Sequence, residues 1–321
     1  MAMARPMELQ GNLFTLDSPL LGEILGERTV AEFPFFALKK ARQLEPMTFQ
    51  AEGVTIELSA GKHGIATIYD KEILLYVASI MTDLRDRGGT PARTIRFTAH
   101  DLFRITGSNA SKRSYAYLID ALRRLRNTIV ETNIATGGET QEDNFSWLDH
   151  FRVMYAEDSR GEKRVKYIEV TVCDWFYRAV LRDRRLAAYD LDYFTLTPIQ
   201  RRLYELAMFH CQPGKPFTLG LEEVSQRMGC GAARLRNARA EITKVAEQDS
   251  LPGYSLSLHS EKVPTAGRPR LQTFVTFTAH PAQRSRPIVP QAATLASSDD
   301  VRSDEQLKVY EDVAEAAAEA A

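Results

Sequence analysis

Two segments of the chain place arginine, lysine and asparagine on one face of an expected helix. Between residues 111 and 129, leucine and alanine recur every three or four positions, which is the spacing of a buried helical stripe. The opposite face then carries Lys112, Arg113, Ala116, Asp120, Arg123 and Asn127. A second helix, expected near 234–247, directs outward Arg236, Asn237, Ala240 and Lys244, with Arg234 and Arg239 on its flanks.

These side chains are suited to hydrogen bonding with DNA. Arginine can bind guanine through two hydrogen bonds and asparagine can read adenine, so Arg236 and Asn237 are predicted base contacts. Phosphate contacts are predicted for Arg234, Arg239 and Lys244. A solvated charged face is common on any single helix, but two such helices, each behind a short capped helix, favour DNA binding.

The elements expected around the first long helix have the order of a winged-helix domain. A periodic helix from Tyr69 ends at Gly88-Gly89, and a strand is expected over 94–97. Thr98 begins a short helix that ends at Gly107. The antiparallel wing is then expected from three strand candidates, at 128–134, 151–155 and 165–172.

A second unit repeats this order. Pro198 opens a helix, a short helix follows over 220–229, and a long helix comes next. The nine-residue intervals Thr98 to Gly107 and Gly220 to Gly229 indicate a duplication. Strands 254–258 and 271–278 flank a basic wing with Arg268 and Arg270, for which a solvated loop and a phosphate contact both remain open.

The sequence therefore predicts an α+β protein of two tandem winged-helix, or helix-turn-helix, domains with a flexible C-terminal tail. The expected divisions are an N-terminal arm packing on the first domain (1–68), a first domain (69–190), a second domain (191–280) and a disordered acidic tail (281–321). Net charge is −1, but the stretch from Asp299 holds eight acidic and two basic residues. The remainder is mildly basic, as a nucleic-acid binder requires.

Enzymatic and exported classes of protein find no support. Cys173, Cys211 and Cys230 form no CxxC pair, so no disulfide framework or zinc site is expected. The glycine-lysine pairs lack the spacing of a phosphate-binding loop, and no His-x-His pair occurs. With no signal peptide and no membrane-length apolar run, a cytoplasmic, non-enzymatic protein without metal or cofactor is expected.

Three segments, at 97–103, 117–134 and 193–206, resemble the replication initiator protein A family of plasmids and phages. The resemblance implies binding to repeated origin sequences in double-stranded DNA, local duplex opening, and recruitment of a host initiation protein and the replicative helicase. It makes Arg234, Arg236, Asn237 and Arg239 the origin-reading set. It also implies a role for Lys112, Arg113 and Arg123 of the first unit, either in supporting contacts with DNA or as part of a homodimer surface.

Two other functions remain open from the sequence. A transcriptional repressor, acting on its own gene or another, would use the same DNA-binding modules. A rolling-circle nickase would use one of the twelve tyrosines as nucleophile.

Overall fold

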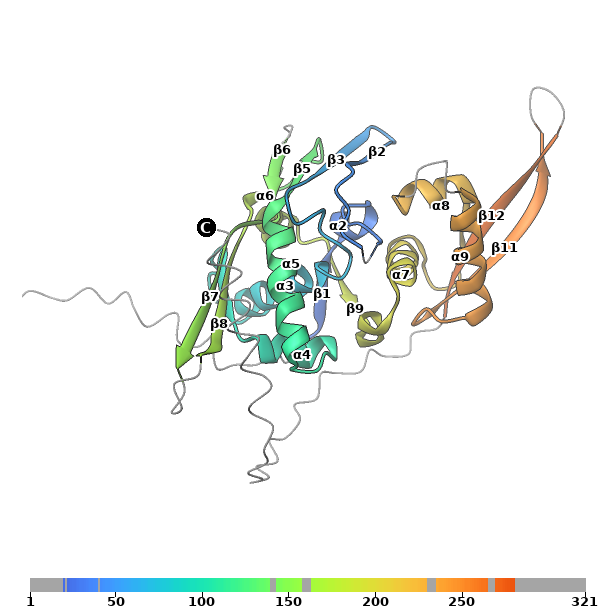
Figure 1. Ribbon diagram of the computed structural model, residues 1–321. Coiled ribbons are helices and arrows are strands. Elements are labelled where there is room, and N and C mark those ends of the chain that lie inside the picture. Colours follow the sequence, from blue (N-terminus) through green and yellow to red (C-terminus); the bar gives the residue numbers. More distant parts are fainter. Residues whose placement is uncertain are drawn as a thin grey trace, which may run out of the picture.

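The computed structural model describes residues 20, 22–39, 41–138, 143–157, 163–229, 235–264 and 269–280. Helices and strands are mixed throughout, so the predicted α+β class is confirmed. The predicted disordered tail, 281–321, lies outside the described residues, as do the predicted contacts Arg234 and Arg268. Figure 1 shows two groups of elements, and α7, the first helix of the second group, lies on the side that faces the first group.

The first group contains the predicted helix, strand, short helix and long helix, followed by a hairpin. Its elements are α3 (Lys71–Asp86), β4 (Thr94–Phe97), α4 (Ala99–Thr106), α5 (Lys112–Asn127), β7 (Leu148–Glu157) and β8 (Lys163–Val172). The three strands form an antiparallel sheet in the order β4-β8-β7.

The second group has the same order of elements. These are α7 (Pro198–His210), β10 (Phe217–Gly220), α8 (Leu221–Arg227), α9 (Leu235–Gln248), β11 (Tyr254–Val263) and β12 (Arg270–Ala279). Its sheet, β10-β12-β11, has the strand order of the first, with the last strand in the centre. The duplication predicted from the nine-residue intervals is therefore matched by two sheets of equivalent topology.

Local sequence explains the ends of the short helices. The Thr98 hydroxyl accepts a hydrogen bond from the Asp101 amide at 3.2 Å, which satisfies a free donor at the start of α4. Gly107, after α4, and Gly229, after α8, adopt left-handed φ angles of 67° and 70°. A side chain at either position would be strained, so glycine ends both helices in the same way.

The predicted wing of the first unit was wrong in one strand. β5 (Thr128–Thr132) follows α5 directly, but it does not join the β7–β8 hairpin. It pairs instead with β3 (Val54–Ala60) and β6 (Asp143–Ser146) in a separate sheet of order β2-β3-β5-β6, where β2 is Met47–Ala51. The β3–β5 pairing joins residues 68 to 76 positions apart in sequence, which strand periodicity cannot reveal.

The remaining short elements connect the two groups. β1 (Ile24–Glu27) pairs with β9 (Leu186–Tyr189), and α2 (Arg28–Glu32) packs on α7. Between β8 and β9 the chain forms α6 (Asp174–Arg178) and a π-helical turn, Ala179–Asp183. Between β9 and α7 it forms a 3-10 turn, Leu191–Thr195. One continuous hydrophobic core includes residues on both sides of position 190, so the two groups pack as one body.

Three consecutive charged residues at the start of α3 tie this body together. Asp70 accepts two hydrogen bonds of 2.7 Å from Arg124 of α5. Lys71 contacts Glu205 of α7 at 2.7 Å, and Glu72 contacts Arg201 of α7 at 2.6 Å. Adjacent residues of one helix thus hold both the long helix of the first group and the first helix of the second.

The Lys71–Glu205 pair is the buried centre of this junction. Lys71 is 1% exposed, and burial lowers the pKa of its ammonium while Glu205 opposes that shift. The Glu205 carboxylate also accepts hydrogen bonds from the hydroxyls of Tyr193, at 2.7 Å, and Tyr189, at 3.3 Å. Because buried ion pairs need near-complete hydrogen bonding, this geometry fixes how the helices meet.

Candidate nucleic-acid interface

Helix α9 presents a free cationic face. Its buried side consists of Ala238, Ile242 and Val245, at the spacing of one helical stripe. The predicted contact residues lie away from that stripe and are exposed: Arg236, Asn237, Arg239 and Lys244. Within the described part of the chain, no ion pair or side-chain hydrogen bond engages these four side chains. They are therefore available to a ligand.

The same face suits close approach to DNA. Ala240 lies between Arg236 and Lys244 on the outward side and is exposed, so no bulky side chain separates the helix from a groove. Guanidinium and amide groups can reach base edges, whereas the ammonium of Lys244 acts as a point charge toward phosphate. The outward, exposed positions of these residues are those expected from the sequence, and their base and phosphate roles stay predictions.

The β11–β12 hairpin extends beside α9. Its strands pair continuously from Tyr254 opposite Ala279 to Val263 opposite Arg270. Arg270 is exposed at the end of the described ladder, next to the segment that holds Arg268. Figure 1 shows the hairpin projecting past the ends of α8 and α9. Arg270 thus lies at the end of the hairpin that is far from the core.

Two cations on the equivalent face of α5 have partners on the same helix. Arg113 donates a hydrogen bond to the Tyr117 hydroxyl at 2.7 Å and lies 5.2 Å from the centre of its ring. Arg123 forms an ion pair with Asp120 at 3.3 Å, and Lys112 is half-buried. Arg113 and Arg123 therefore have partners on their own helix, whereas no described residue pairs with Arg236, Arg239 or Lys244 of α9.

A loop between β3 and α3 also lies against the end of α5. The Gly61 amide donates to the Asn127 carbonyl at 3.0 Å, and the Asn127 side chain donates to the Arg123 carbonyl at 2.7 Å. Burial and the nearby charge of Arg123 lower the pKa of His63, in the same loop. Asn127 thus caps its own helix, and a role in reading DNA would require these contacts to open.

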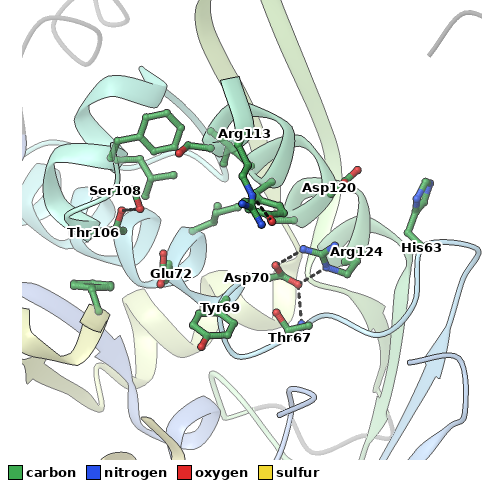
Figure 2. Close-up of a pocket in the computed structure, with 18 of the residues that line it drawn as sticks. His63, Thr67, Tyr69, Asp70, Glu72, Thr106, Ser108, Arg113, Asp120 and Arg124 are labelled. Carbon is green, nitrogen blue, oxygen red and sulfur yellow. Dashed lines mark hydrogen bonds and ion pairs between the residues drawn. The ribbon is translucent and has the colours of Figure 1, made fainter. Parts of the chain in front are cut away.

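A cavity of about 800 Å³ opens along α5. Figure 2 shows the Asp70–Arg124 ion pair inside it, with Arg113 directed toward the same space and His63 at one side. The lining combines apolar and charged side chains, and includes Arg42, Lys62, Ile73, Phe103, Tyr117, Phe194 and Arg201. It is lined by α5 from Arg113 to Arg124 and by the β3–α3 loop, and the lining charges Asp70 and Glu72 are paired with Arg124 and Arg201.

His210 ends α7 as a packed side chain. Its ring stacks on Phe217 at 4.5 Å between centres, with 13° between the planes. Its Nε2 atom is buried and has no hydrogen-bond partner among the described residues. Burial, with the nearby arginines 227, 28 and 202, lowers the pKa of His210 to about 4. The structure thus favours the packing role inferred from the sequence over a role as ligand.

Protonation of His210 should reduce stability in mildly acidic solution. An unfolded chain binds this proton below pH 6.5, whereas the folded chain resists it until about pH 4. Stability is therefore expected to fall as pH decreases through that window, and His210→Leu should lessen the fall. Urea midpoints of both proteins between pH 7 and 4.5 test this. Parallel pH profiles for the two proteins would contradict the assignment.

Neither a membrane-spanning helix nor a cluster of metal-binding side chains is found in the described ranges. No helix there is long and apolar enough to cross a bilayer. No cluster of three or more histidine, cysteine, aspartate or glutamate side chains in these ranges could hold a metal ion.

Comparisons with known proteins agree with this architecture. A curated relative from Wigglesworthia glossinidia brevipalpis, named “Putative replication protein”, is 28% identical over 246 residues, which cover 76% of this chain and 88% of the relative. A crystal structure of domains 2 and 3 of RctB superposes with a TM-score of 0.53 at 15% identity, covering 80% of this chain and 99% of that one. A second structure of the RctB domains gives 0.50 at 14% identity, with coverages of 78% and 96%.

The RctB likeness is a likeness of fold, since so few residues are identical. The family comparison is more specific, because the model of replication initiator protein A matches residues 26–256, from β1 into β11. This span contains α3, α5, α7 and α9, together with the junction that joins them. The chain therefore belongs to the replication initiator protein A family.

Proposed function

We propose that this protein is a non-enzymatic initiator that binds repeated double-stranded sequences at a plasmid or phage replication origin. Its two units act as tandem winged-helix domains, and the second is the principal reader. The observation that carries this proposal is the face of α9, where Arg236, Asn237, Arg239 and Lys244 are exposed and have no partner among the residues that the structure describes. A recognition helix in the major groove needs such a face.

Each side chain then has a distinct role. Arg236 and Asn237 contact base edges, and Arg239, Lys244 and Arg270 contact phosphates. Arg113 and Arg123 on α5 add supporting contacts once they leave their internal partners. Binding should weaken steeply with salt, since every neutralised phosphate releases counterions.

Initiation needs more than binding. In this proposal, occupation of several repeats promotes local duplex opening and brings a host initiation protein and the replicative helicase to the origin. The first unit provides the surface for a homodimer. These steps rest on membership of the family, and they place the protein with DNA in the cytoplasm.

Replication of a minimal plasmid tests this function. A plasmid with this gene, its flanking DNA and a selectable marker should be maintained in a suitable host, and a stop codon early in the gene should abolish maintenance. If the plasmid is lost although the protein binds the flanking DNA specifically, the same modules serve a repressor instead.

A covalent intermediate tests the nickase alternative. Supercoiled plasmid carrying the flanking DNA should remain uncut when incubated with the protein and a divalent cation. A protein–DNA adduct that survives denaturing electrophoresis would overturn the non-enzymatic assignment.

A further inference from the structure

Two glycines fix a short turn in the loop between β3 and α3. The amide of Gly64 donates to the carbonyl of Gly61 at 3.0 Å, and the Gly61 amide donates to the carbonyl of Asn127 at the end of α5. A Cβ atom at Gly61 would lie 2.9 Å from that carbonyl oxygen, and one at Gly64, where φ is +86°, would lie 2.9 Å from the side chain of Arg42. The turn is therefore held between α5 and the segment that carries Arg42.

This turn presents cations without internal partners. Lys62 and Arg42 are exposed, and in the described ranges neither forms an ion pair or a side-chain hydrogen bond. His63 adjoins them: burial, followed by the charges of Arg123 and Lys62, lowers the pKa of its imidazole, and Arg42 lowers it further. Three cations thus act on one imidazole, and positive charge is concentrated at this turn.

The cavity of about 800 Å³ along α5 starts at the same turn. Figure 2 shows His63 at one end of it, Thr106 and Ser108 at the other, and Arg113 and Arg124 between them. Small-molecule sites have volumes of roughly 300–1,000 Å³. The cavity is therefore large enough for an elongated small molecule.

The end of the cavity away from His63 is apolar. Leu102 and Phe103 of α4 line it in the helical turn before Thr106. Ile73 and Phe194, which also line the cavity, come from elements that pack on α4. All four side chains are buried, and such a surface suits a flat aromatic group better than a charged one.

The charges of the lining indicate an anionic ligand. Each acid of the lining already has a cationic partner, in the pairs Asp70–Arg124, Glu72–Arg201 and Asp120–Arg123. Three lining cations, Arg42, Lys62 and Arg113, have no acidic partner among the described residues. The cavity thus has an excess of positive charge, which a ligand with several negative charges would neutralise.

We infer that this cavity binds a nucleoside polyphosphate, with its phosphates at Arg42, Lys62 and Arg113 and its base at the apolar end. Side chains rather than a glycine-rich run of backbone amides supply the charge, so the site differs from the phosphate-binding loop of an ATPase, and hydrolysis is not part of the proposal. Arg113 is also a proposed supporting contact for DNA. Bound nucleotide would therefore act on the first unit and leave α9 unchanged.

Calorimetric titration of the full chain with ATP, GTP, CTP and TTP tests this inference. At least one nucleotide should bind with a stoichiometry of one per chain. Tripolyphosphate and the matching nucleoside should bind more weakly, because each occupies one end of the cavity. Lys62→Ala and Arg42→Ala should each weaken nucleotide binding about tenfold, the usual effect of losing one hydrogen bond to a charged group.

Two variants serve as controls for charge. Lys166→Ala removes an exposed cation of the first unit that does not line the cavity, and it should leave the nucleotide affinity unchanged. Arg236→Ala should also bind nucleotide like wild type, which separates the cavity from general attraction of polyanions to α9. Because Lys62 and Arg42 are exposed, their variants should keep the wild-type urea midpoint, so lost binding will not reflect lost folding.

Three results would overturn the inference. The first is no saturable binding of any of the four nucleotides at millimolar concentration, and the second is tripolyphosphate binding as tightly as the nucleotide. The third is a single-stranded oligonucleotide that binds more tightly than the nucleotide and is weakened equally by Lys62→Ala, which would assign the cavity to a DNA strand. None of these measurements depends on α9, so the proposed function can stand or fail separately.

Discussion

Glu205→Ala is expected to destabilise the protein by about 3–5 kcal/mol, the usual cost of leaving a buried charge without its partner. The substitution removes the carboxylate that faces Lys71 at 2.7 Å and Arg202 at 3.4 Å. Both cations are almost fully buried, and burial already lowers the pKa of each. Urea denaturation followed by circular dichroism measures the loss.

Glu52→Ala provides the matched control. Glu52 also pairs with an arginine, Arg227, at 2.7 Å, but its side chain is 65% exposed. Arg227 itself is buried but keeps a second partner, Glu223, at 3.2 Å, so this change should move the midpoint much less than Glu205→Ala. Equal midpoints for the Glu205 and Glu52 variants would show that the buried junction does not hold the two units together.

Arg236→Ala is expected to reduce specific DNA binding by about 1–3 kcal/mol and to relax the base preference at one position. The reason is geometric, because Arg236 is exposed on the outward face of α9 and no described residue forms an ion pair or hydrogen bond with its guanidinium. Lys244→Ala should instead weaken all sequences alike and lower the salt dependence, as a lost phosphate contact does.

Arg123→Ala is the control on the other long helix. Arg123 is already paired with Asp120, so its loss should cost less affinity than the loss of Arg236. Anisotropy titrations on a duplex selected from a random pool by the full chain, and on random DNA, measure all three variants. Equal losses on both duplexes for Arg236→Ala and Lys244→Ala would remove the base-reading role from Arg236.

The parts of the fold that depend on neighbouring residues could be predicted from the sequence. Thr98 caps α4 and Gly107 ends it because each acts within one turn of the chain. The outward position of Arg236 and Asn237 follows from the spacing of Ala238, Ile242 and Val245. These features require no knowledge of distant partners.

The parts that depend on distant residues could not be predicted. β5 follows α5 directly, yet its partner strand is β3, from the N-terminal region. Lys71 and Glu205 are separated by 134 positions, and nothing in the spacing of charges near Lys71 indicates that it is buried. Strand pairing and buried ion pairs are set by tertiary packing, which one sequence does not display.

The candidate site shows the same limit. Helical periodicity treats α5 and α9 alike, since both carry cations opposite an apolar stripe. The Arg113–Tyr117 contact joins residues four positions apart on α5, so it is local and could be read from that spacing. The approach of the loop at Gly61 to Asn127 is a tertiary contact, which the spacing does not reveal. Together these contacts within the first unit make α9 the principal reader in the proposed function.

Footprinting on the DNA that flanks the protein's own gene tests the central claim most directly. The wild-type protein should protect several copies of one repeated sequence. The double variant Arg236→Ala, Asn237→Ala should lose this protection, and Arg113→Ala, Arg123→Ala should retain most of it. Protection unchanged by the α9 variant, or no protected repeats with wild-type protein, would contradict the proposal that α9 reads a replication origin.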